Sequence, residues 1–131
     1  MLIAIPTEDK RLLFNGHFGD APIFLIYNEN LELIKEIKNS TLDIEEDGFE
    51  HHGNPVKAKK IIELLNSIDV LVAKEMGGNM RRVAKRFKLV FSKIDSIDEL
   101  LTKLKNNLDS NKETILLIKK DSISSIKNKF I

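Results

Sequence analysis

The chain has 131 residues, of which 42% are hydrophobic and 31% charged, so it fits one domain that can bury roughly two-thirds of its unfolded surface. Its 21 basic and 20 acidic residues nearly cancel, which disfavours a bulk electrostatic nucleic-acid binder. The absence of cysteine excludes a disulfide framework, a thiolate metal site and a thiol nucleophile.

Three short strands are predicted in the N-terminal part of the chain. Residues 2–5 are an apolar run that Pro6 stops, which is typical of a buried strand. The segment Ile23–Tyr27 is the next strand candidate, and residues 31–37 follow after an Asn-Glu-Asn turn at residues 28–30. Two short strands around such a turn indicate a hairpin.

A helix is predicted from Pro55, because Asn54 is a good N-cap and proline fits the first helical position. Its expected apolar stripe consists of Val56, Ile61, Leu64, Leu65 and Ile68. Val70–Ala73 then has the composition of a buried strand. It is followed by a glycine turn and a short helix over residues 80–87, with Val83, Ala84 and Phe87 facing inward.

The last predicted elements are a strand, a helix and a tail. Residues 89–91 form the strand, and residues 97–108 form an amphipathic helix that Ser96 and Glu99 begin as a capping box. Residues 114–118 are consecutive apolar or β-branched residues and suggest one more strand, with a short helical tail after it.

Hairpin strands followed by βαβ units predict an α/β sandwich. We expect a ribonuclease-H-like, three-layer α/β/α fold with a mixed five-stranded sheet, strand order 3-2-1-4-5, and strand 2 antiparallel. Residues 1–111 would form this domain, and residues 112–131 would be a C-terminal extension packed on it or on a partner chain. An added strand exposes a new sheet edge, which favours association into a homodimer.

This topology brings three loops to one edge of the sheet, namely residues 6–22, 38–54 and 74–79. Ligands of open α/β sheets bind at such carboxyl edges, near a switch in strand order. All three histidines lie in these loops. We therefore expect the functional site there.

Histidine is the first candidate ligand. His17 lies between glycines in the run Gly16-His17-Phe18-Gly19, and neutral imidazole binds borderline metals. The alternative is a loop histidine hydrogen-bonded to backbone, with Phe18 as a core residue. One of His51 and His52 could converge with His17 on a metal, or both could belong to a solvated loop.

A glycine turn followed by basic residues is the second candidate. Gly77, Gly78 and Asn79 precede Arg81 and Arg82, and backbone amides at a helix N-terminus favour anions. The alternative is an ordinary strand-to-helix turn with a solvated basic face. The glycine spacing matches neither a Walker loop nor a dinucleotide fingerprint.

The motifs at residues 3–6 and 17–24, Ile-Ala-Ile-Pro and His-Phe-Gly-Asp-Ala-Pro-Ile-Phe, resemble the opening of the dinitrogenase iron–molybdenum cofactor biosynthesis family. The resemblance covers roughly residues 1–104 and implies a ribonuclease-H-like fold. It also implies a carrier of an iron–molybdenum cofactor or precursor, with His17 as the implicated histidine.

These features together predict a small cytoplasmic, non-enzymatic carrier or chaperone for an anionic metal–sulfur cluster, with cluster donor and acceptor proteins as partners. His17 would contact the metal, His51 or His52 would add a contact, and the remaining cofactor-binding residues would be Phe18, Gly19, Gly77, Gly78, Asn79, Arg81 and Arg82. No apolar run approaches the ~20 residues of a membrane span, and no signal peptide is recognisable.

Two other functions remain open. One is a metal-free module that senses anions or binds proteins. The other is a metal-dependent hydrolase or nuclease, which is disfavoured because residues 2–5 and Val70–Ala73 carry no acidic side chain.

Overall fold

The structure, a computed structural model, describes residues 1–42, 55–79, 82–83 and 85–110. Its centre is one five-stranded sheet with the order β3-β2-β1-β4-β5, as the sequence predicts. The strands are β1 (Ile3–Thr7), β2 (Ile23–Tyr27), β3 (Leu33–Lys38), β4 (Val70–Ala73) and β5 (Lys88–Phe91).

The strand directions also match the prediction. β2 is antiparallel to both β1 and β3, whereas β1, β4 and β5 are mutually parallel. Four strands therefore point the same way, and the loops that follow them meet at one carboxyl edge.

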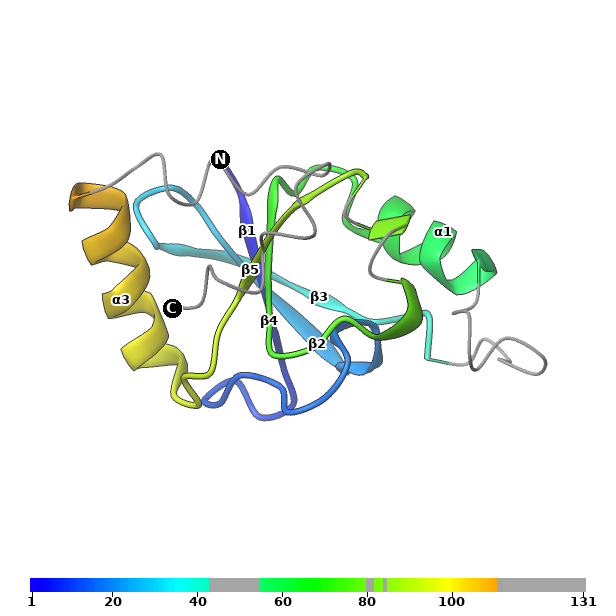
Figure 1. Ribbon diagram of the computed structural model, residues 1–131, viewed down its shortest axis with the longest axis horizontal. Coiled ribbons are helices and arrows are strands. Elements are labelled where there is room, and N and C mark those ends of the chain that lie inside the picture. Colours follow the sequence, from blue (N-terminus) through cyan, green and yellow to red (C-terminus); the bar gives the residue numbers. More distant parts are fainter. Residues whose placement is uncertain (43–54, 80–81, 84, 111–131) are drawn as a thin grey trace.

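Two α-helices, α1 (Pro55–Leu64) and α3 (Ile97–Ser110), lie on opposite sides of the sheet (Figure 1). Every residue of β1 and β4 is buried, which is typical of strands that are covered on both faces. Two short 3₁₀ helices, η1 (Phe18–Asp20) and η2 (Gly77–Asn79), lie in the loops after β1 and β4.

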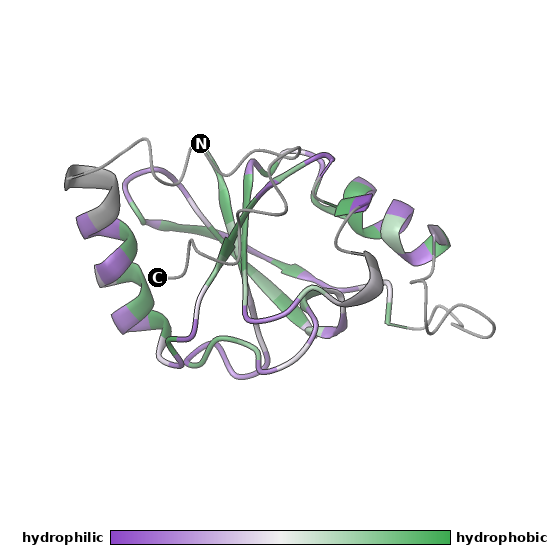
Figure 2. Ribbon diagram, viewed as in Figure 1, coloured by the Kyte–Doolittle hydropathy of each residue, from purple (hydrophilic) through white to green (hydrophobic). Residues whose placement is uncertain are grey.

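The apolar stripe of α3 forms much of one side of the core. Ile97, Leu100 and Leu104 are buried, while the outward positions are charged or polar (Figure 2). The amide of Glu99 donates a hydrogen bond to the hydroxyl of Ser96, which fits the predicted cap. No helix within the described residues is long and apolar enough to span a bilayer.

The prediction for the first strand was too short. β1 continues through Pro6, which pairs with Phe24 of β2. Proline is tolerated there because the pairing with β4 covers only Ile3 and Ala4, so Pro6 does not have to donate a hydrogen bond to that neighbour.

The predicted stripe of α1 was partly wrong. Ile61, Leu65 and Ile68 are buried, but Val56 is 55% exposed. The buried face instead begins with Lys57 and Ala58, one position further along the helix. Lys57, Ile61 and Leu65 are spaced by four residues and therefore share one face.

The boundaries of other elements shifted slightly. β3 begins at Leu33 instead of residue 31, and β5 begins at Lys88. Of the helix predicted over residues 80–87, Arg82 and Val83 are helical, and Val83 and Phe87 are buried as expected. The strand predicted at residues 114–118, and the extension 112–131 that contains it, lie outside the described residues.

Candidate functional site

The backbone of His17 is fixed where the loops after β1 and β4 meet. His17 forms an isolated parallel bridge with Glu75, and the next amide, that of Phe18, donates a 2.8 Å hydrogen bond to the carbonyl of Glu75. Phe18 itself is buried and stacks on Phe24 of β2 with ring centroids 4.8 Å apart. The motif therefore anchors a core aromatic and presents a histidine beside it.

The imidazole of His17 packs directly against Gly77. A Cβ atom added to Gly77 would lie 2.7 Å from Nδ1 of His17, closer than real Cβ contacts allow. Gly77 also has a φ of +72°, in the left-handed region that other L-residues rarely adopt. The structure thus brings together the histidine motif and the glycine turn, which are separate in the sequence.

Two carboxylates flank the ring of His17. Nδ1 lies 4.0 Å from Oδ2 of Asp20, and Nε2 lies 3.6 Å from Oε2 of Glu75. Both distances exceed hydrogen-bond length, so these are ion-pair contacts that depend on the charge of the imidazole. The side chain of His17 is 53% exposed, which leaves it accessible to a ligand.

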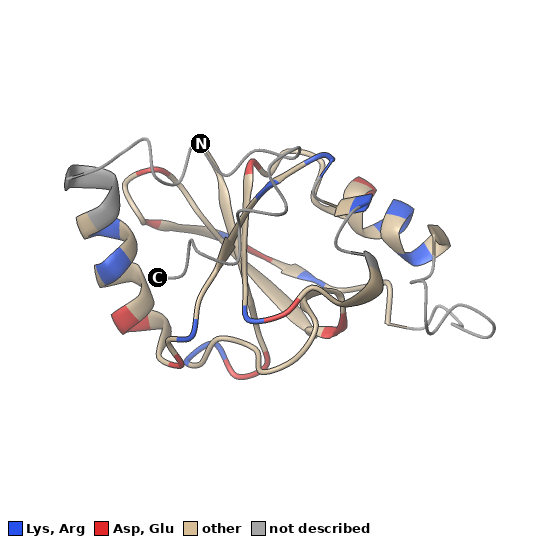
Figure 3. Cartoon of the chain, in the orientation of Figure 1, with Lys and Arg blue, Asp and Glu red and all other residues tan. Residues whose placement is uncertain are grey.

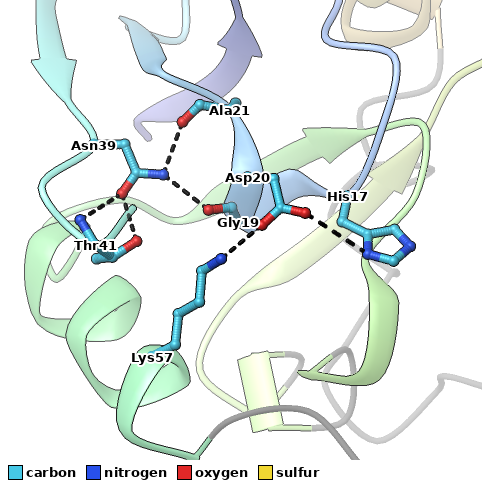
Figure 4. A network of polar contacts seen from close by, with 7 residues as sticks. All are labelled: His17, Gly19, Asp20, Ala21, Asn39, Thr41 and Lys57. Carbon is cyan, nitrogen blue, oxygen red and sulfur yellow. Dashed lines mark hydrogen bonds and ion pairs between the residues drawn. The ribbon is translucent and has the colours of Figure 1, made fainter. Parts of the chain in front are cut away.

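Lys57 of α1 holds Asp20 from the other side (Figure 4). Its Nζ lies 2.6 Å from Oδ1 of Asp20, and its side chain is only 9% exposed. Its Cε also lies 3.7 Å from the position of a Cβ on Gly19, so the lysine stem covers this glycine. The ion pair ties the first turn of α1 to the loop that carries His17.

Asn39, just after β3, secures the same loop (Figure 4). Its amide group donates hydrogen bonds to the carbonyls of Gly19 (2.8 Å) and Ala21 (2.7 Å). Its side-chain oxygen accepts hydrogen bonds from the amide and the hydroxyl of Thr41. All three loops predicted at this edge therefore contribute to the site.

The site also contains four residues that the sequence did not predict for it, namely Lys57, Asp20, Asn39 and Glu75. Charged and amide side chains in loops or on a helix are usually solvated, so their residue types alone do not predict that they belong to a site. The four-residue spacing of Lys57 from Ile61 and Leu65 was the one available signal, since it places the lysine on the buried stripe.

The structure describes only some of the predicted anion contacts. Gly78, which follows Gly77 in the chain, is exposed. Arg82 lines a groove of about 540 Å³ along α1, with Lys59, Glu63 and Arg86 among its neighbours. Basic residues follow one another along α1 (Figure 3). His51, His52, Arg81 and the side chain of Asn79 lie outside the description.

Among the described residues, no group of three or more histidine, aspartate or glutamate side chains could hold a metal ion. The site around His17 therefore offers few protein ligands. Such a donor set fits a metal that brings other ligands of its own, and it does not fit a closed structural metal site.

Comparisons with known proteins agree with this fold. The crystal structure of a protein from Methanocaldococcus jannaschii, provisionally called a dinitrogenase, superimposes with a TM-score of 0.52 at 17% identity and covers 81% of this chain and 89% of its own. None of the curated proteins matches the chain. A family model described as dinitrogenase iron-molybdenum cofactor matches residues 1–107. The chain therefore belongs to the dinitrogenase iron-molybdenum cofactor family.

Proposed function

We propose that this protein is a non-catalytic carrier for an iron–molybdenum cofactor-like metal–sulfur cluster or its precursor. The observation that carries the proposal is the placement of His17. Its imidazole is half exposed, rests on Gly77 and is anchored through its backbone to the turn after β4. Membership in a family named for the iron–molybdenum cofactor supports the class of cargo.

The chemistry of the site suits a cargo that must be released. One imidazole can bind an exposed metal atom of a cluster whose other positions are filled by its own sulfides. In the proposal, His51 or His52 adds a second contact, Gly77 and Gly78 face the anionic parts of the cargo, and Arg81 and Arg82 supply positive charge. Phe18 and Gly19 hold the motif in place.

A carrier needs a protein that supplies its cargo and one that accepts it. We expect both partners to approach the carboxyl edge of the sheet, because the half-exposed ring of His17 lies there. This part of the proposal predicts that cluster transfer to an acceptor is slower when the edge is blocked.

The test is an anaerobic titration of the purified chain with isolated iron–molybdenum cofactor. Binding is monitored by the electronic spectrum of the cofactor and by elemental analysis of the protein. Native protein should bind, and His17→Ala should bind at least ten times more weakly, since a metal contact is lost. Glu99→Gln serves as the control, because Glu99 is exposed and belongs to α3, on the side of the sheet opposite to α1. Equal binding by native protein and His17→Ala, with both folded, would contradict the proposal.

The groove beside α1 favours a second candidate, a metal-free module that binds anions or proteins. Among the residues that the structure describes, the cationic side chains of Lys59, Arg82 and Arg86 line it together with the carboxylate of Glu63. Titration with inorganic phosphate or pyrophosphate tests this function. The carrier proposal would give way to this one if metal-free protein binds phosphate or pyrophosphate, Arg86→Ala weakens that binding, and the protein has no affinity for the cofactor.

A further inference from the structure

We infer that Glu75 is the second protein ligand of the His17 site, so that Nε2 of His17 and the Glu75 carboxylate together bind one divalent transition-metal ion. This inference rests on the proposed function, and it adds which protein atoms of the same site would bind the metal. It also rests on observations of its own, and its test uses a metal ion alone.

The distance between the two ligand atoms fits one shared ion. Metal–nitrogen and metal–oxygen bonds of roughly 2.1 Å at a tetrahedral angle place the two ligand atoms about 3.4 Å apart. Nε2 of His17 and Oε2 of Glu75 are 3.6 Å apart. A movement of a few tenths of an ångström in either side chain is enough to hold an ion between them.

Backbone contacts also hold the two ligands in position. The bridge between His17 and Glu75, with the 2.8 Å hydrogen bond from the Phe18 amide to the Glu75 carbonyl, fixes the two backbones side by side. Gly77 supports the Nδ1 edge of the ring. Both side chains remain open to solvent, at 53% and 64% exposure, so a metal ion can reach them.

The local charges favour a cation over a free anion. Asp20 and Glu75 both face the imidazole, but Asp20 is paired with Lys57 at 2.6 Å. The carboxylate of Glu75 therefore adds a negative charge beside Nε2, on the open side of the ring. An ion, or an exposed metal atom of a cluster, gains from this charge, whereas a sulfide face of a cluster is repelled.

The types of the two ligands restrict which metal ions the site would bind. Imidazole with one carboxylate suits borderline ions such as Zn²⁺, Co²⁺, Ni²⁺ or Fe²⁺ and is a poor match for Cu⁺, which prefers sulfur ligands. Two protein ligands leave the other coordination positions to water or to ligands of the cargo. Such a site exchanges its metal readily, as a carrier requires.

The test is calorimetric titration of the full chain with Co²⁺ alone, together with the visible spectrum of the bound ion. Native protein should bind one Co²⁺ at this site, and Glu75→Gln and His17→Ala should each bind at least ten times more weakly, with an altered cobalt spectrum in Glu75→Gln. Glu99→Gln, the matched loss of an exposed glutamate, should bind as the native protein does. The series is repeated with His51 and His52 replaced by alanine, which removes any contribution of these two residues to binding.

Two results would overturn the inference: native affinity and spectrum in Glu75→Gln, or no Co²⁺ binding by the native chain. Neither result would contradict the carrier proposal, because that proposal is tested by cofactor binding in the native protein and in His17→Ala. If His17→Ala keeps the cofactor while Glu75→Gln loses Co²⁺, the carrier proposal fails and the metal-ion site stands.

Discussion

Lys57 and Asp20 form an ion pair that joins two segments 37 residues apart, with Nζ of the lysine 2.6 Å from Oδ1 of the aspartate. The lysine lies almost entirely within the protein, at 9% exposure, whereas the aspartate is 52% exposed. Because the other oxygen of Asp20 faces Nδ1 of His17, the pair connects the start of α1 to the orientation of the imidazole. A carboxylate that accepts a hydrogen bond from the non-ligating nitrogen orients many metal-binding histidines, and at 4.0 Å from Nδ1 Asp20 lies just beyond that distance.

Replacing Lys57 by methionine should lower the free energy of unfolding by about 1–2 kcal/mol. Breaking a fully buried pair costs roughly 3–5 kcal/mol, but water can solvate the half-exposed carboxylate of Asp20, which reduces the loss. Urea unfolding followed by circular dichroism measures the change. The metal affinity of His17 should fall as well, because Asp20 is then free to turn away from the ring.

Lys60→Met is the matched control on the same helix. Lys60 lies 3.8 Å from Glu63, and both side chains are more than half exposed. Surface pairs of this kind contribute about 0–1 kcal/mol, so this variant should unfold almost as the native protein does. Equal losses in both variants would show that the Asp20 contact has no special effect on stability.

Gly77→Ala should disturb both the fold and the ring that rests on it. The left-handed φ of +72° costs an alanine about 1–2 kcal/mol, and the new Cβ would displace His17 from its present position. Urea unfolding gives the stability, and the ¹H–¹⁵N spectrum of the imidazole reports the displacement.

The stability control for this variant is Gly19→Ala, where the new Cβ would meet Lys57 at an ordinary contact distance of 3.7 Å. We expect a much smaller loss of stability there. If Gly77→Ala is no less stable than Gly19→Ala and leaves the imidazole signals unchanged, the packing of His17 on Gly77 does not determine the position of the ring.

Asn39→Ala should be the most destabilising of these changes, by about 2–4 kcal/mol. It removes both donors to the carbonyls of Gly19 and Ala21, and it leaves the buried amide of Thr41 without its acceptor. Asn39→Asp keeps the acceptor for Thr41 but sets a carboxylate oxygen against the carbonyls of Gly19 and Ala21, so thermal unfolding should show a loss of stability in this variant as well. A loss below about 0.5 kcal/mol in Asn39→Ala would contradict the role given to this residue.

The strand order could be predicted because it depends on long, regular patterns. A hairpin followed by βαβ units leaves few arrangements of five strands, and the carboxyl edge follows from the order. The continuation of β1 through Pro6 could not be predicted in this way. It depends on where the pairing with β4 ends, and the sequence of β1 alone contains no sign of that.

The site shows the same division between regular patterns and particular contacts. The meeting of the His17 loop with the Gly77 turn follows from the topology, so the sequence predicts it. The contacts of Asp20 with Lys57 and of His17 with Glu75 depend on side-chain positions set by three different segments. Arg82, predicted as an anion contact, lines the groove along α1, and the spacing of residues alone does not show which face of the molecule an arginine joins.

The turn before the His17 loop should make stability depend on pH in the acid range. Oδ1 of Asp9 accepts hydrogen bonds from the amides of Leu12 and Arg11, each 2.9 Å long, and these bonds, that of Leu12 first, lower the pKa of Asp9 from its ordinary value of 3.8. A lowered pKa in the folded state means that the ionised carboxylate stabilises the fold above about pH 4. That contribution is lost as the pH falls through the lowered value.

Asp9→Asn should therefore be less stable than the native protein at pH 5–6, and the difference should shrink towards the acid end of a series of urea unfolding curves between pH 2 and 6. Asparagine can still accept the two amides, so only the charge-assisted part of the interaction is removed. Glu8→Gln, the loss of an exposed carboxylate next to this turn, controls for the change in net charge. Asp9 has no such effect if the two proteins differ by the same amount at every pH, because a difference that does not vary with pH cannot come from the ionisation of this carboxyl group.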